Sequence, residues 1–170
     1  IKNLQLDTSG AEDAYSDYIK TTSSTTFTIR SDASDGVGRV NKNGDNYVAY
    51  CFAEVEGYSK IGSYMGNGNV DGTFVFTGFR PAWVLLKNTA RSADWRINDS
   101  TRQHENNVGY SSAHLLLANS TSSEITNEYD IDFLSNGFKL RSSDVYENGS
   151  GEAFIYMAFA EAPFKYANAR

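Results

Sequence analysis

The sequence predicts an all-β fold, a β-sandwich or jelly-roll of about ten short antiparallel strands. Short apolar runs alternate with turn segments rich in Ser, Thr, Asn and Asp roughly every ten residues. The chain contains 14 Gly and only 2 Pro. No segment shows the apolar periodicity of a helix of normal length. Many short strands separated by turn residues are typical of sandwiches and jelly-rolls.

The length of 170 residues is sufficient for one domain with a buried core. Residues 1–25 are polar and are expected to form a lead-in segment or linker, in which residues 11–20 form at most a short helical turn. Residues 26–170 are expected to form the β-sandwich domain. Because the sequence begins with Ile1 rather than Met, we expect it to be the end portion of a longer protein or a processed product.

A nine-residue phrase occurs twice, at residues 47–55 and 154–162. When the two Phe-Ala-Glu triplets are aligned, the side-chain sizes agree at almost every position. Alternate residues of a strand face opposite sides, so each copy has one bulky face and one mostly small face, and both faces are apolar. Such strands are typical of the centre of a layered β protein, and we predict that both copies lie in the core. The bulky positions on one side of the sheet are Tyr50, Phe52, Met157 and Phe159.

The other elements follow from alternation and β-branched content. Strands are predicted at residues 25–30, 46–55, 58–65, 73–77, 80–87, 94–98, 113–118, 131–134, 137–141 and 152–162. Pro81 favours the first position of its strand, because proline cannot donate to a central ladder. Turns are predicted at residues 32–38, 43–45 and 67–72, and polar surface loops at residues 99–112, 120–130 and 142–151.

Charge and cysteine content exclude several functional classes. Fifteen Lys and Arg against 21 Asp and Glu give a formal net charge of −6, which is unfavourable for binding a nucleic-acid backbone. No apolar run reaches the roughly 18 residues of a membrane span, and we expect no signal peptide. We therefore expect neither nucleic acid nor membrane as a partner. Cys51 is the only cysteine, and its place in an apolar phrase predicts a buried, unreactive thiol.

One segment imitates a calcium loop, in which oxygen ligands fall at alternate positions. Asn67, Asn69 and Asp71 supply such oxygens and Gly72 would make the sharp turn, but the twelfth position is Gly78, which has no carboxylate. A hairpin turn is the better interpretation. We expect no metal and no cofactor.

No set of residues predicts catalysis. His104 and His114 are the only histidines, and no Gly-x-Ser-x-Gly nucleophile elbow is present. Glu54 and Glu161 occupy equivalent ends of the repeated phrase and could form a glycosidase pair. They are better explained as charges that end an apolar strand. We predict that the chain is not an enzyme and has no catalytic residue.

The polar loops hold aromatic and cationic side chains that suit glycan binding. Tyr stacks on sugar rings and hydrogen-bonds to hydroxyls, while Arg pairs with acidic sugars. The alternative is that these side chains only fill contacts between subunits. The candidate binding residues are Arg91, Trp95, Arg102, His104, Tyr110, Tyr129 and Tyr146.

Four phrases, in this order along the chain, resemble a family of domains of unknown function in marine bacteriophage tail and fibre-like virion proteins. They are residues 47–68, 78–87, 131–141 and 155–164. The resemblance extends over residues 25–170 and supplies no catalytic residues. It implies location on the virion, at the extracellular surface of the particle.

The expected function is that of a non-enzymatic phage virion structural module of tail or fibre type, with host-surface glycan as a ligand. Its expected partners are other virion subunits and further copies of itself, with a trimer favoured. Two alternatives remain open, a capsid decoration protein and a polysaccharide depolymerase. The depolymerase would require carboxylates such as Glu54, Asp132 and Glu161 to converge in a cleft.

Overall fold

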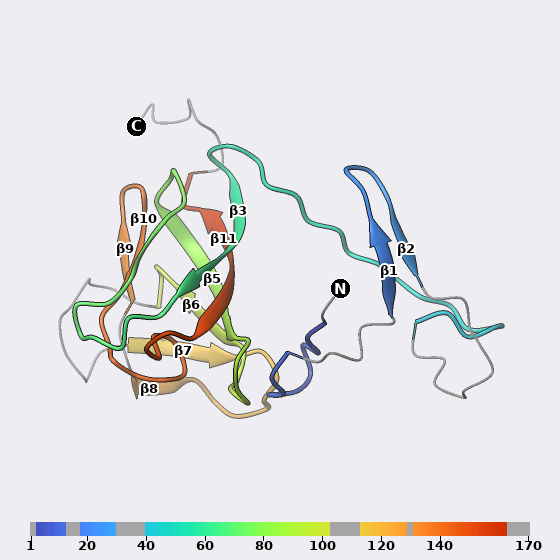
Figure 1. Ribbon diagram of the computed structural model, residues 1–170. Helices are drawn as coiled ribbons and strands as arrows, with labels where there is room; N and C mark the ends of the chain where they lie inside the picture. The colour runs from blue at the N-terminus through green and yellow to red at the C-terminus, as the bar shows by residue number, and fades with distance from the viewer. Residues whose placement is uncertain (1–2, 13–17, 30–39, 103–112, 129–130, 163–170) are drawn as a thin grey trace. The chain divides into compact units, whose positions relative to one another are not determined.

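The computed structural model describes residues 3–12, 18–29, 40–102, 113–128 and 131–162. These residues form eleven strands and no helix, which confirms the predicted all-β class. With no helix among them, this part of the chain contains no helical membrane span. The strands make three antiparallel sheets of two, three and six strands (Figure 1).

The chain divides into two compact units, and the division does not coincide with the predicted boundary at residue 25. The smaller unit comprises residues 1–4 and 12–52, and the larger unit comprises residues 5–11 and 53–170.

The smaller unit contains a two-stranded hairpin. Strand β1 (Ile19–Thr22) pairs with β2 (Phe27–Ile29), and every residue of both strands is exposed. The Ser23 hydroxyl accepts the backbone N–H of Thr26 at 2.9 Å, which closes the turn between the strands. Part of this hairpin lies in residues 11–20, for which the sequence allowed only a helical turn.

The larger unit is built on a six-stranded sheet in the order β3-β11-β5-β6-β7-β8. Its strands are β3 (Ser59–Met65), β5 (Pro81–Asn88), β6 (Arg96–Asp99), β7 (Ala113–Leu117), β8 (Ile125–Glu128) and β11 (Ala153–Ala160). Pro81 takes the first position of β5, as predicted. β8 was not predicted: it lies within the expected 120–130 loop, where only Ile125 and Thr126 suggest a strand, and it forms by pairing with β7.

A three-stranded sheet in the order β4-β10-β9 forms the second layer. Strand β4 (Phe74–Phe76) pairs with β10 (Gly137–Leu140), which in turn forms the predicted hairpin with β9 (Ile131–Leu134). Figure 1 shows β9 and β10 side by side on one side of the six-stranded sheet.

The core lies between these two layers. Phe138 of β10 makes edge contacts with Tyr64 of β3 and Tyr156 of β11, at ring-centroid distances of 6.2 and 5.4 Å. Phe154 of β11 stacks on Tyr64 at 5.0 Å and is fully buried. Apolar side chains from both sheets therefore form one cluster, as sandwich packing requires.

The two copies of the repeated phrase differ in structure. The second copy forms β11, which is hydrogen-bonded to β3 on one edge and to β5 on the other. The first copy is not assigned as a strand: within the described part of the chain, residues 45–54 have no ladder partner, and Val55 forms an isolated bridge to Ser59. The prediction of a core strand at residues 46–55 is therefore wrong. An alternating apolar pattern gives a segment two side-chain faces. A strand also needs a neighbouring strand that hydrogen-bonds to its backbone N–H and C=O groups.

Two further predictions on these phrases are corrected. Cys51 is exposed rather than buried, because the segment that carries it has no sheet around it. In β11 the positions buried toward the core are Phe154, Tyr156 and Ala158. The bulky positions Met157 and Phe159 do share one side of the sheet, but that side is the opposite, half-buried one.

Candidate functional site: the loop from residue 142 to residue 152

The loop that precedes β11 is held in place by buried polar side chains. Asn148 is fully buried, and its amide nitrogen donates to the Ser142 carbonyl at 2.7 Å and to the Asn67 side-chain oxygen at 2.8 Å. Its own oxygen accepts the Asn67 backbone N–H at 3.0 Å. The loop is thereby tied to the 67–72 turn.

Close backbone approach reinforces this connection. A Cβ atom on Gly66 would lie 2.2 Å from the Gly149 carbonyl oxygen, so only glycine fits at position 66. The Gly68 N–H donates to the Asn148 carbonyl at 2.8 Å, and the Gly151 N–H donates to the Gly66 carbonyl at 2.9 Å. Backbone contacts therefore fix the second half of the loop, from Asn148 to Gly151.

An ion pair lies beneath the middle of the loop. Arg96 of β6 donates from Nη1 to Glu147 Oε1 at 2.9 Å, and these side chains are only 8% and 1% exposed. The Glu147 carbonyl accepts the Tyr64 hydroxyl at 2.6 Å. Burial, together with the nearby negative charge of Glu147, raises the pKa of Tyr64 well above its usual value. The phenol therefore remains a neutral donor that holds the loop.

A second group of side-chain contacts, made by Asn88 and Arg91, holds the loop at Val145 and Glu152. The Asn88 amide donates to the Val145 carbonyl at 2.8 Å and to Glu152 Oε2 at 2.7 Å. Arg91 forms a salt bridge with Glu152, and its hydrogen bonds are the main reason that the pKa of this carboxyl lies below its usual value. Arg91 therefore already has a carboxylate partner within the chain.

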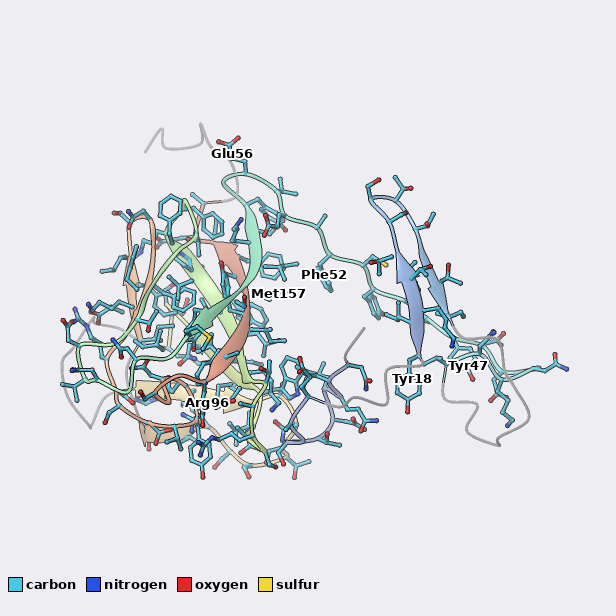
Figure 2. All side chains as sticks on the ribbon, in the orientation of Figure 1. Tyr18, Tyr47, Phe52, Glu56, Arg96 and Met157 are labelled. Atoms are coloured by element: carbon cyan, nitrogen blue, oxygen red, sulfur yellow. The ribbon has the colours of Figure 1, made fainter. Side chains whose placement is uncertain are left out.

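This framework presents Tyr146 at the surface, 43% exposed. The Arg96 guanidinium carbon lies 5.5 Å from the Tyr146 ring centroid, a cation–π distance, and Figure 2 labels Arg96 in the lower part of the larger unit. The Asp144 carboxylate accepts the Tyr146 backbone N–H at 2.7 Å, which fixes the turn. A ring on so constrained a loop offers stacking surface at a low entropic cost.

The other predicted site residues lie in different surroundings. Trp95 is 9% exposed, its ring N–H donates to the Gln5 carbonyl at 2.9 Å, and little of its ring could contact a ligand. Arg102 pairs with Asp99 at 2.6 Å and with Glu124 at 2.8 Å. His104, Tyr110 and Tyr129 lie outside the described residues. Of the predicted set, the structure brings Arg91 and Tyr146 to the same loop region.

Arg102 belongs to a separate polar group at the other end of β6 and beside β7. His114 Nδ1 lies 3.3 Å from Glu124 Oε2, so Glu124 contacts both an arginine and a histidine. The hydrogen bond from Arg102, followed by that from His114, lowers the pKa of Glu124. The geometry of this group is that of a surface ion-pair network among Asp99, Arg102, His114 and Glu124.

The calcium-like segment is a turn whose oxygens are already used. Asn67 and Asn69 each accept a backbone N–H two residues further on, at 3.0 and 2.9 Å. The Asp71 carboxylate pairs with Lys139 at 2.7 Å, which is the main cause of its lowered pKa. These contacts fit the predicted turn. The described residues contain no group of three or more His, Cys, Asp or Glu that could hold a metal ion.

The three carboxylates that a depolymerase would require each pair with a different cation. Glu54 pairs with Lys60 at 2.8 Å, Glu161 with Arg80 at 2.8 Å, and Asp132 with Arg141. The hydrogen bond from Lys60 lowers the pKa of Glu54. A glycosidase acid needs the opposite shift, since it must stay protonated near neutral pH.

Sequence reasoning missed the residues that build the loop. Asn88, Arg96, Glu147 and Asn148 are all buried, although their residue types usually predict exposure. Arg96 lies between the apolar residues Trp95 and Ile97, a pattern that predicts solvent exposure for the charged position, whereas the structure buries it. Glu147 and Asn148 lie in a polar, glycine-containing stretch, where nothing in the local pattern marks them as buried.

Comparison with known proteins gives one family. The sequence profile described as "Domain of unknown function (DUF7483)" matches residues 1–163. No curated protein and no solved structure matches the chain significantly.

Proposed function

The chain belongs to the DUF7483 family, and from this premise we propose that it is a non-enzymatic structural and binding module of a phage virion protein of tail or fibre type. In this proposal it is displayed on the particle and contacts a host-surface glycan through the 142–152 loop. The virion location rests on the resemblance of four sequence phrases to phage virion domains. The binding role rests on the chemistry of the loop.

The observation that carries the binding role is an exposed aromatic ring on a rigid polar loop. Tyr146 presents its ring to solvent while buried contacts of Glu147 and Asn148 fix the adjacent backbone. Sugar rings present C–H faces that stack on aromatic side chains, and their hydroxyls bind to polar groups around the ring. Asp144 and Arg91 lie beside Tyr146 and can supply such polar contacts.

A non-enzymatic role agrees with how the titratable groups are used. Glu54, Asp132 and Glu161 form separate ion pairs on separate elements. Arg91 and Arg102 are also paired within the chain, so a neutral or hydroxyl-rich ligand suits the site better than a strongly acidic one. The formal charge of −6 would also disfavour an anionic polymer.

The direct test is binding of the purified chain to an array of bacterial surface glycans. A Tyr146→Ala variant should lose about 5- to 150-fold in affinity, since one stacked aromatic contributes on the order of 1–3 kcal/mol. Tyr50→Ala is the matched control, because Tyr50 is also an exposed tyrosine and lies outside the loop. Equal losses in both variants, or glycan binding that neither substitution changes, would exclude the loop as the site.

Two further measurements are needed. One tests whether the rigidity of the 142–152 loop contributes to glycan binding, and the other tests whether the chain is part of the virion. Asn148→Ala should weaken binding while leaving Tyr146 in place, because the loop loses its connections to Ser142 and Asn67. Mass spectrometry of purified phage particles should find the chain. Its absence from particles would remove the virion role while leaving the glycan result to stand by itself.

A further inference from the structure

The face of the six-stranded sheet opposite the core is apolar across five strands. The strand register places Ile61, Met157, Leu85, Ile97 and Leu116 side by side in one row from β3 to β7. Cross-strand partners point to the same side of a sheet, so these side chains form a continuous stripe. Figure 2 shows Met157 on the side of β11 that faces away from β9 and β10.

Neighbouring rows widen this stripe. Phe159 lies opposite Trp83 in the ladder, and its ring is 5.7 Å from the Trp83 ring and 5.8 Å from the Tyr58 ring. Ile155 lies two residues before Met157, on the same face of β11. We call these residues together with the row the outer face. All of them except Tyr58, which is exposed, are half-buried, and none belongs to the core cluster formed by the described residues.

The outer face has an uncharged centre and paired charges at one margin. Lys87 is the one charged residue of β5, and its side chain is covered: it is 1% exposed and donates to the Asn88 carbonyl at 2.7 Å. At the β6 end Asp99, which lies opposite Trp83 in the ladder, pairs with Arg102. An apolar centre that contains Met and aromatic residues, surrounded by a polar rim, is the usual anatomy of a homodimer interface.

We propose that the outer face packs against the outer face of a second copy of this chain, around a two-fold axis. Five strands about 4.8 Å apart and the length of β11 from Ile155 to Phe159 give a patch on the order of 500 Å² once side-chain widths are included. That is more than half of the roughly 800 Å² that each partner buries in a standard interface. A two-fold contact is self-complementary, so the chain supplies both surfaces.

The charge pattern of the outer face is compatible with a second copy. Each chain carries a formal charge of −6, so two copies repel one another at long range, and salt screens this repulsion. The outer face adds little to it, because Asp99 at its margin is paired within the chain. Two such sheets would stack about 10 Å apart, as the layers of a β-sandwich do.

Light scattering coupled to size exclusion, over a range of concentrations, tests the proposal on the 170-residue chain. The mass should be that of two chains. The double variant Ile155→Thr/Met157→Thr should raise the dimer dissociation constant about 10,000-fold, from about tenfold for each of the four side chains that the two chains together lose from the interface centre. Threonine keeps β propensity, which limits the effect on the sheet itself.

Phe76→Thr is the control, because Phe76 is an exposed apolar residue on β4 of the other sheet and should leave the dimer unchanged. If circular dichroism shows that the double variant is unfolded, Leu116→Thr at the far end of the row replaces it. A monomer at every concentration would overturn the proposal. An assembly with an odd number of chains, or one that a folded outer-face variant leaves intact, would also overturn it.

Discussion

Residues 47–55 and 154–162 carry nearly the same pattern of side chains, yet one copy is a central strand and the other is not a strand. Phe154 is fully buried, while its counterpart Tyr47 is 47% exposed. Ala158 is fully buried and its counterpart Cys51 is exposed. The difference lies in the backbone pairing: the second copy has β3 and β5 on its two edges, whereas the first copy pairs with the described residues through the isolated Val55–Ser59 bridge.

This comparison shows that an apolar alternating pattern is a necessary condition for a core strand and not a sufficient one. Burial of an apolar side chain contributes free energy only when other side chains surround it, and the backbone needs hydrogen-bond partners in the same place. The rigid 142–152 loop leads directly into the second copy and fixes where β11 begins. No comparable buried network is seen around the described part of the first copy.

The largest difference between the two copies is expected at their first positions. Phe154→Ala should destabilise the larger unit by about 3–5 kcal/mol, because it leaves a cavity beside Tyr64. Tyr47→Ala should cost less than about 1 kcal/mol. Denaturant unfolding followed by tryptophan fluorescence measures the effect of each variant on the larger unit, since Trp83 and Trp95 both lie there. Similar costs for the two variants would contradict the assignment of only one copy to the core.

Thiol chemistry tests the same contrast at the matched pair Cys51 and Ala158. Cys51 should react with a thiol reagent at nearly the rate of a free cysteine, because it is exposed. In a Cys51→Ser background, Ala158→Cys should react at least about 1,000-fold more slowly, since the reagent must wait for the sheet to open. Protection of Cys51 in the native chain would mean that the first copy is covered in solution.

On the half-buried face of β11, the matched substitutions in the two copies should differ less in their cost in unfolding free energy. Phe159→Ala should cost about 1–3 kcal/mol, less than for a full core position, because Phe159 contacts Tyr58 and Trp83 but keeps part of its surface in solvent. Phe52→Ala, at the matched position, should stay within about 0.5 kcal/mol. Thermal unfolding of the two variants gives the comparison. A cost for Phe159→Ala equal to that for Phe154→Ala would show that both faces of β11 are buried.

The smallest effect is expected at the end of the first copy, where Glu54 pairs with Lys60. The hydrogen bond from Lys60 lowers the pKa of Glu54 below its unfolded value of about 4.3. Its stabilising contribution is therefore complete above that value and is lost as pH falls through the lower folded pKa. An NMR titration should show the lowered pKa, and Lys60→Met should return it toward the usual value. An unchanged titration in Lys60→Met would exclude the pair as its cause.

The sequence by itself was sufficient for the all-β class and for most of the strands. β3, β4, β5 and the β9–β10 hairpin follow from alternation bounded by Gly, Asn and Asp, since these are local signals that a single segment carries. The polar character of the 142–152 loop and the exposure of Tyr146 were predictable for the same reason. Neither property depends on what another part of the chain does.

Only the tertiary structure decided which copy of the repeated phrase became a strand and which face of β11 met the core. Both outcomes depend on residues distant in sequence, namely the partners of β11 in β3 and β5 and the rings of Tyr64 and Phe138. The burial of the Arg96–Glu147 pair and of Asn148 also depends on residues that are distant in sequence. Most buried charged and polar residues have a partner that satisfies them, and the local sequence does not contain that partner.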